Sequence, residues 1–169
     1  RIQFRAKIGI TIDTDIDKAY GVFVKVNPAE LKRALSNLIN NSIEAFPNEI
    51  GKVLIAIKKN GDQAEIVITD NGKGIPSSVL SKLGEKGFSY GKDKSGDSGS
   101  GLGVFHAKNF IQSCGGKFSI HSTEMPASNH GTTIHFVLPI QPSPNWFVEK
   151  LKFSLGQNVC IDENADVHA

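Results

Sequence analysis

Two asparagines in the first third of the chain have a spacing that could serve chemistry. Asn37 and Asn41 are four residues apart, so on a helix their side-chain amides would emerge side by side. An amide oxygen is a hard neutral ligand that suits Mg²⁺, which also takes water and phosphate oxygens. A solvated helix surface can carry the same pair, so the spacing alone leaves both interpretations open.

A carboxylate and two glycines follow a stretch that is typical of a buried strand. Residues Asp70–Gly74 have the sequence DNGKG. A carboxylate at a strand end can accept a hydrogen bond from an exocyclic amine, and glycine lets the chain pass close to a ring. An ordinary Asp-Asn-Gly turn has the same sequence, so this motif also has two interpretations.

The glycines are concentrated in one part of the chain: nine of the seventeen lie between Gly72 and Gly103. Residues 99–103 (GSGLG) open a helical pattern, and glycines at a helix N-terminus let phosphate oxygens reach free N–H groups. The spacing is not that of a Rossmann fingerprint. It is not a Walker A loop either, since Lys86 and Asp93 stand where that motif needs glycine and Ser or Thr. The cluster predicts a flexible loop, a phosphate cradle or both, against the alternative of a disordered surface insertion.

A mixed set of strands and helices must position these residues. Asn27-Pro28 predicts a helix start, and apolar residues at 3.6 spacing extend this helix to the residue before Pro47. Asn60-Gly61 predicts a β-hairpin. In the returning strand, the apolar run at residues 66–68 predicts burial on both faces. Strands are expected at residues 2–12, 20–26, 52–58, 64–69, 117–122 and 132–138, and helices at residues 28–46 and 102–114.

Composition excludes several classes of protein. The 169 residues are 39% apolar and 21% charged, which fits a folded domain and not a disordered chain. The longest apolar runs are about five residues, whereas a membrane helix needs ~20, and residues 1–20 show no signal-peptide pattern. A net charge of +2 does not predict nucleic-acid binding. Two cysteines cannot form a disulfide framework or a four-ligand zinc site, so a reducing, cytoplasmic setting is expected.

The order of the motifs resembles the catalytic and ATP-binding domain (HATPase_c) of bacterial sensor histidine kinases, within the GHKL ATPase superfamily. Each motif alone is unspecific, and the likeness rests on their order over about residues 2–139. The matching segments are Asn37–Ser42 (NLINNS) with the N box, Asp70–Gly74 with the G1 box, Phe88 and its neighbours with the F box, Gly99–Gly103 with the G2 box, and Gly131-Thr132-Thr133 with the last glycine box.

The resemblance implies an α+β fold, a two-layer α/β sandwich known as the Bergerat ATP-binding fold. Its sheet is mixed and mostly antiparallel, with helices on one face and a mobile ATP lid, here at about residues 76–98. The catalytic domain is expected at residues 1–139, and residues 140–169 are expected to be a linker or tail. An apolar run ending in Asp162-Glu163 resembles the first strand of a receiver domain, and an ordinary tail explains it as well.

The same resemblance implies ATP as the bound nucleotide and assigns residues to the base. Asp70 should accept a hydrogen bond from the adenine amino group, and Thr132 should assist through a water molecule. The other residues expected to contact the nucleotide are Gly72, Gly74, Ile75, Phe88, Ser100 and Leu102.

For the phosphates, the resemblance implies Mg²⁺ as the metal. Asn41 should bind this ion, with Asn37 beside the phosphates as a second catalytic residue. Gly101 and Gly103 should offer backbone N–H groups, and Lys92 should supply a mobile positive charge. Phosphoryl transfer depends mainly on such positioning and charge neutralisation.

One position separates the branches of the superfamily. Clamp-type ATPases carry a water-activating glutamate one turn before the Mg²⁺ asparagine, and this chain has Asn37 there. Because a neutral amide is no general base, the sequence favours transfer of the γ-phosphate to a protein acceptor. Glu44 stands where the family often has Lys or Arg. A clamp ATPase, an anti-sigma-type serine kinase and a non-catalytic nucleotide-binding module are the alternatives.

The histidines do not supply the acceptor that this family phosphorylates. None of the five lies in a helical-hairpin pattern followed by an acid or an amide, and His106, His121 and His135 are interpreted as structural or surface residues. The expected partners are therefore the protein's own upstream dimerisation and phosphoacceptor hairpin, and a response regulator or receiver domain. No contact of this domain with nucleic acid or a membrane is expected.

Overall fold

The computed structural model describes residues 9–85, 102–148, 152–153 and 159–160. These residues contain a six-stranded sheet in the order β1-β3-β4-β6-β2, in which β5 also pairs with β6. β1 runs parallel to β3, and the other pairs are antiparallel. The strands are β1 (Ile10–Asp15), β2 (Phe23–Val24), β3 (Gly51–Asn60), β4 (Gln63–Asp70), β5 (Lys117–Thr123) and β6 (Gly131–Gln141).

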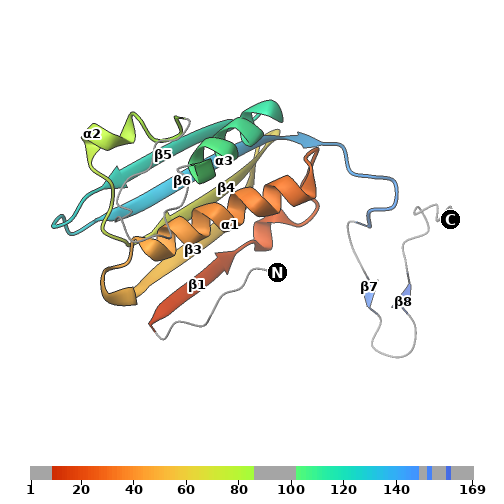
Figure 1. The fold of residues 1–169 in the computed structure, drawn as a ribbon. Helices are drawn as coiled ribbons and strands as arrows, with labels where there is room; N and C mark the ends of the chain where they lie inside the picture. Colours follow the sequence, from red (N-terminus) through yellow and green to blue (C-terminus); the bar gives the residue numbers. More distant parts are fainter. Residues whose placement is uncertain (1–8, 86–101, 149–151, 154–158, 161–169) are drawn as a thin grey trace.

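Two helices cover one face of this sheet, as Figure 1 shows. They are α1 (Pro28–Glu44) and α3 (Leu102–Ser113). The predicted start of α1 is confirmed, because the Asn27 side chain accepts hydrogen bonds from the N–H groups of Ala29 and Glu30 at 2.9 and 3.3 Å. The short elements are η1 (Asp17–Ala19), η2 (Pro47–Glu49) and α2 (Ser77–Leu80). The predicted α+β class, with helices on one face of a mixed sheet, is confirmed.

The core lies between the helices and the sheet. Its fully buried side chains come from both layers and include Leu38, Val53, Ile68, Ile111 and Phe136. On β4, β5 and β6 the even-numbered residues face the helices, because successive side chains of a strand point to opposite faces. Burial of each large apolar side chain stabilises the fold by roughly 1.5–3 kcal/mol.

The prediction that β4 is buried on both faces is wrong. Ile66 and Ile68 are 6% and 1% exposed, whereas Val67 between them is only half-buried. The helices cover a single face, and Val67 points to the other face, where it lies opposite His135 of β6. An apolar residue on the uncovered face made the run look like a strand buried on both sides.

The predicted hairpin at Asn60-Gly61 is confirmed, since β3 ends at Asn60 and β4 begins at Gln63. β6 continues through Gln141, two residues past the expected domain edge, and its Ile140 pairs with Val24 of β2. β7 (Lys152–Phe153) and β8 (Val159–Cys160) pair with each other in a separate ladder. The expectations for residues 2–8, for the lid beyond residue 85, and for Asp162-Glu163 lie outside the described residues.

Candidate functional site

Three polar side chains form a row across neighbouring strands at one end of the core. Asp70 of β4 lies opposite Thr132 of β6, and Thr132 lies opposite Ser122 of β5. All three have even numbers and therefore point to the helix-covered face, where the residues before them on each strand are apolar. The row marks the place where the apolar core ends and a polar site begins.

The Asp70 carboxylate is the most tightly held group of the row. It is 6% exposed, and its Oδ1 accepts hydrogen bonds from the N–H groups of Gly72 and Thr132 at 2.9 and 3.1 Å. Burial raises the pKa of Asp70, and the hydrogen bonds from Gly72, Ser42 and Thr132 oppose this rise by stabilising the anion. A carboxylate has about four lone-pair sites, so with these three donors Asp70 can still accept a hydrogen bond from a ligand.

The turn interpretation of the Asp70–Gly74 segment is confirmed, and the binding interpretation stays a prediction. The bond from Gly72 N to Oδ1 is the local turn that an Asp-Asn-Gly sequence favours, and Asn71 also serves structure by accepting from the N–H of Lys52 at 2.7 Å. The bond from Thr132 N comes from a residue 62 positions away. The turn therefore fixes the carboxylate at the strand end instead of competing with a binding role.

Glycines at this turn allow close packing against the protein itself. A Cβ on Gly72 would lie 2.8 Å from Cβ of Ala45, just beyond α1. Gly74 has φ +74°, and a Cβ there would collide with the carbonyl oxygen of Thr123. Gly131, at φ +135°, meets the Asp70 carbonyl in the same way. Bulkier residues would push the 70–75 turn off the helix and the β5–β6 hairpin.

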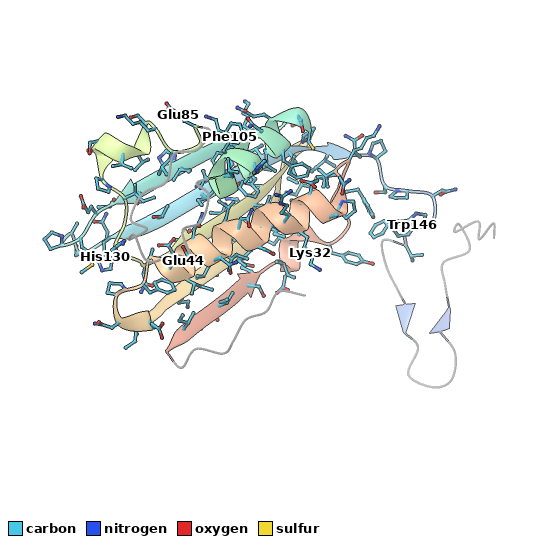
Figure 2. The ribbon with its side chains drawn as sticks, viewed as in Figure 1. Lys32, Glu44, Glu85, Phe105, His130 and Trp146 are labelled. Atoms are coloured by element: carbon cyan, nitrogen blue, oxygen red, sulfur yellow. The ribbon has the colours of Figure 1, made fainter. Side chains whose placement is uncertain are left out.

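The β5–β6 hairpin holds the turn from the other side. Met125 N donates to the carbonyl of Lys73 at 3.0 Å. Nδ1 of His130 lies 2.7 Å from the carbonyl oxygen of Gly72, and this ring nitrogen must carry the proton because a carbonyl can only accept. Figure 2 labels His130 and Glu44 toward the same end of the molecule, where α1 ends.

α1 contacts both this turn and the start of α3. Asn37 and Asn41 are half-buried on α1, and Ser42, which follows Asn41, is 3% exposed and hydrogen-bonds to Asp70. Gly103, in the first turn of α3, faces Asn37: a Cβ at Gly103 would lie 3.4 Å from Cβ of Asn37. The structure thus brings the asparagines, the carboxylate and a helix N-terminus to one end of the fold.

The predicted site residues fall into two groups. Asn37, Asn41, Asp70, Gly72, Gly74, Thr132 and Gly103 gather at this end, with Leu102 as the first residue of α3 and Ile75 donating its N–H to Ser122. Phe88, Lys92, Ser100 and Gly101 lie outside the described residues. Among the described residues, no three His, Cys, Asp or Glu side chains form a metal-binding group. In the same part of the chain, no helix is long and apolar enough to cross a bilayer.

Sequence reasoning gave no role to three residues that shape the site: Ser42, Ser122 and His130. Alternation along β5 and β6 could have placed Ser122 beside Thr132, because both strands have a clear period of two. The roles of Ser42 and His130 depend on how α1 and the hairpin pack against the 70–75 turn. No local pattern signals that packing.

Residues 26–142 match the family model of histidine kinase-, DNA gyrase B- and HSP90-like ATPases. The chain belongs to this family. Among curated proteins, one relative is sporulation kinase B of Bacillus subtilis, which is 37% identical over 110 residues, covering 65% of this chain and 24% of the relative. The histidine-protein kinase/phosphatase MprB of Mycolicibacterium vanbaalenii is 34% identical over 117 residues, 69% of this chain and 24% of that protein.

Solved structures agree with the family assignment. The mycobacterial sensor histidine kinase MprB has a TM-score of 0.62 and 29% identity, with 79% of this chain and 85% of that chain covered. Full-length ShkA in complex with AMPPNP shares the fold, with a TM-score of 0.65 at 18% identity over 80% of this chain and 26% of that chain. The chain spans about a quarter of the length of the curated relatives. Its folded domain is the catalytic ATP-binding domain of a sensor histidine kinase, as the order of the motifs predicts.

Proposed function

We propose that this domain binds Mg²⁺-ATP and transfers the γ-phosphate to a histidine on a separate dimerisation hairpin, for relay to a response regulator or receiver domain. The observation that carries the proposal is the buried Asp70 carboxylate, which accepts hydrogen bonds from three donors beside α1. The chain that holds it belongs to this ATPase family. Because ATP is a cytoplasmic nucleotide, a cytoplasmic location of this domain is part of the proposal.

The base would be read by the polar row. Asp70 presents a carboxylate oxygen at the strand end, which suits the exocyclic amine of adenine, and a charged acceptor makes a strong hydrogen bond. Thr132 lies directly opposite and would assist through a water molecule. Gly72, Gly74 and Ile75 form the turn beside the base, with Phe88 as a further contact from the F box.

The phosphates would lie between α1 and the start of α3. The donor set fits Mg²⁺, because the Asn41 amide offers one hard oxygen and phosphate oxygens and water complete the preferred octahedron. Asn37 would lie beside the phosphates opposite Gly103, and the N–H groups of Gly101 and Gly103 would be offered to the anion. Lys92 would add a positive charge from the lid. The metal, when bound, neutralises charge on the transferring group.

In the transfer, a ring nitrogen of the acceptor histidine attacks the γ-phosphorus, and the bond from that phosphorus to the bridging oxygen breaks. The electron pair leaves with ADP, and the imidazole proton leaves to solvent. This chain's own residues contribute position and charge, because Asn37 stands where a water-activating glutamate would make an ATPase.

The test compares transfer with hydrolysis. We expect the chain alone to bind ATP and turn it over very slowly, since a general base supplies typically ~10²–10⁴-fold and Asn37 cannot act as one. Mixed with the purified dimerisation hairpin of the same protein, the chain should label a histidine with an acid-labile, base-stable phosphate. Brisk steady turnover without an acceptor would contradict the kinase proposal and favour a clamp ATPase.

A further inference from the structure

The hydroxyl group of Ser122, on β5, has three hydrogen-bonding partners. Its Oγ lies 2.9 Å from the N–H of Ile75, 2.8 Å from the carbonyl oxygen of Gly131 and 2.9 Å from Oγ1 of Thr132. These three partners belong to the 70–75 turn and to the first two residues of β6. Ser122 therefore joins the turn that carries Asp70 to the strand that carries Thr132.

The chemistry of the partners fixes where the protons lie. A hydroxyl has one proton to give and two lone pairs to receive. The Gly131 carbonyl can only accept, so it takes the Ser122 proton, and the Ile75 N–H fills one lone pair of Ser122. The remaining lone pair must accept from the neighbouring hydroxyl, so the Thr132 proton points at Ser122. The hydrogen-bonding capacity of Ser122 is then fully used.

This arrangement leaves Thr132 with lone pairs only on the side away from Ser122. Its backbone N–H is also engaged, because it donates to Asp70 Oδ1 at 3.1 Å. The ionised Asp70 carboxylate has no proton to give, and Ser42 already donates to it. Across the row, the side chains of Asp70 and Thr132 can accept hydrogen bonds from a ligand, and neither of them can donate one.

We propose that Ser122 is a specificity-positioning residue: by holding the Thr132 proton, it keeps the polar row acceptor-only, so that the site takes a 6-amino purine and rejects a 6-oxo purine. The inference rests on the proposed contact between Asp70 and the base. A purine amine gives two N–H groups to such a row. A 6-oxo group brings another acceptor, which would face oxygens with no proton between them, and a buried polar group without a partner is costly.

The test measures the affinities of ADP and of inosine 5′-diphosphate, which carries an oxo group in place of the amine, for the parent chain and for Ser122→Ala. Loss of Ser122 frees the Thr132 hydroxyl to rotate and donate. We expect ADP to bind about three- to tenfold more weakly and the inosine nucleotide to bind as well as before or better, so that the ADP preference falls. A purely structural role would weaken both nucleotides by the same factor.

Ser119→Ala is the matched control, because Ser119 lies on the same strand, is exposed and points to the uncovered face. It should leave both affinities unchanged. Thr132→Val removes the hydroxyl at nearly constant shape and leaves no Thr132 proton to release, so adding Ser122→Ala to it should leave the ADP preference unchanged. Ser122→Cys keeps the test decisive if Ser122→Ala does not fold. It should also lower the ADP preference, because sulfur is a weak acceptor and holds the Thr132 proton less firmly.

The outcomes separate this inference from the proposed function. A parent that prefers ADP, with a preference that survives Ser122→Ala or Ser122→Cys, contradicts the role of Ser122 and leaves the kinase proposal intact. A parent that binds neither nucleotide contradicts the proposed function, and the inference falls with it.

Discussion

The sheet end that carries Asp70 and the helix pair that carries Asn37 and Asn41 differ in how their polar groups are held. Asp70 and Thr132 are 6% and 7% exposed and are fixed by bonds to three strands and a turn. The two asparagines are half-buried on one helix, beside the first turn of another. The difference matches the proposed tasks of the two regions: a base has one fixed shape, whereas a metal with its waters and a phosphate in transfer needs room to rearrange.

The largest effect should come from removing the fixed carboxylate. Asp70→Ala should weaken ATP and ADP binding by about 100-fold or more, because the amine of the base loses a charged acceptor. Calorimetry checks this, and circular dichroism checks that the fold persists. Asp13→Ala is the control, since the Asp13 side chain is 46% exposed and pairs with Lys52 at 2.7 Å, and it should bind as the parent does. Parent-like ADP affinity in Asp70→Ala would show that the base binds elsewhere.

The second-largest effect is expected on the helix pair that carries Asn37 and Asn41. Asn41→Ala should stop phosphoryl transfer and lower Mg²⁺-dependent ATP affinity about tenfold, whereas metal-free affinity should change by less than about threefold. The affinities are measured by titration with and without Mg²⁺, and transfer is measured with the hairpin supplied. Asn40→Ala, at an exposed neighbouring position, is the control. Equal losses with and without metal would mean that Asn41 supports the base end and not the metal.

A third prediction concerns the backbone under the polar row. Gly131→Ala should lower the free energy of unfolding by about 2–4 kcal/mol, because the residue has φ +135° and its Cβ would collide with the Asp70 carbonyl. Gly61→Ala is the matched case, with φ +60° and open space around the new methyl, and it should cost only about 1 kcal/mol. Urea denaturation measures both. Equal losses of unfolding free energy would mean that the backbone around Gly131 relaxes as easily as the open turn at Gly61.

The smallest effect concerns pH. Because burial raises the pKa of Asp70, the folded chain binds this proton more tightly than the unfolded chain does. The free energy of unfolding should therefore fall as pH rises from the ordinary value of 3.8 through the raised pKa. Asp70→Asn removes the titration, so the difference in stability between parent and variant should change across this window and be flat above it. A difference that is flat throughout would show that hydrogen bonding fully offsets burial.

The two regions also differ in how well the sequence predicts them. The α1 start at Asn27-Pro28 and the Asn60-Gly61 hairpin follow from local chemistry, and both are confirmed. The motif order predicts that Asp70 and the asparagines share one site, because the resemblance to a known family carries long-range information. The burial of β4 on both faces is a wrong prediction, since a single strand does not reveal how many layers cover it. The roles of Ser42 and His130 are not predicted from the sequence, because they arise from packing between distant segments.

The bond between Thr132 N and Asp70 Oδ1 spans 62 residues of chain. A loop of that length is closed only when β6 docks against β4, and contacts so far apart in sequence form late in folding. A partly unfolded molecule with β6 detached would lose one donor to Asp70 and the facing Thr132 together. Nucleotide should therefore stabilise the folded chain: at 100 times its Kd it would add about 2.7 kcal/mol to the unfolding free energy. Because nucleotide binds the folded chain, melting curves recorded at different ATP concentrations would report the fraction of chains that are folded around ATP.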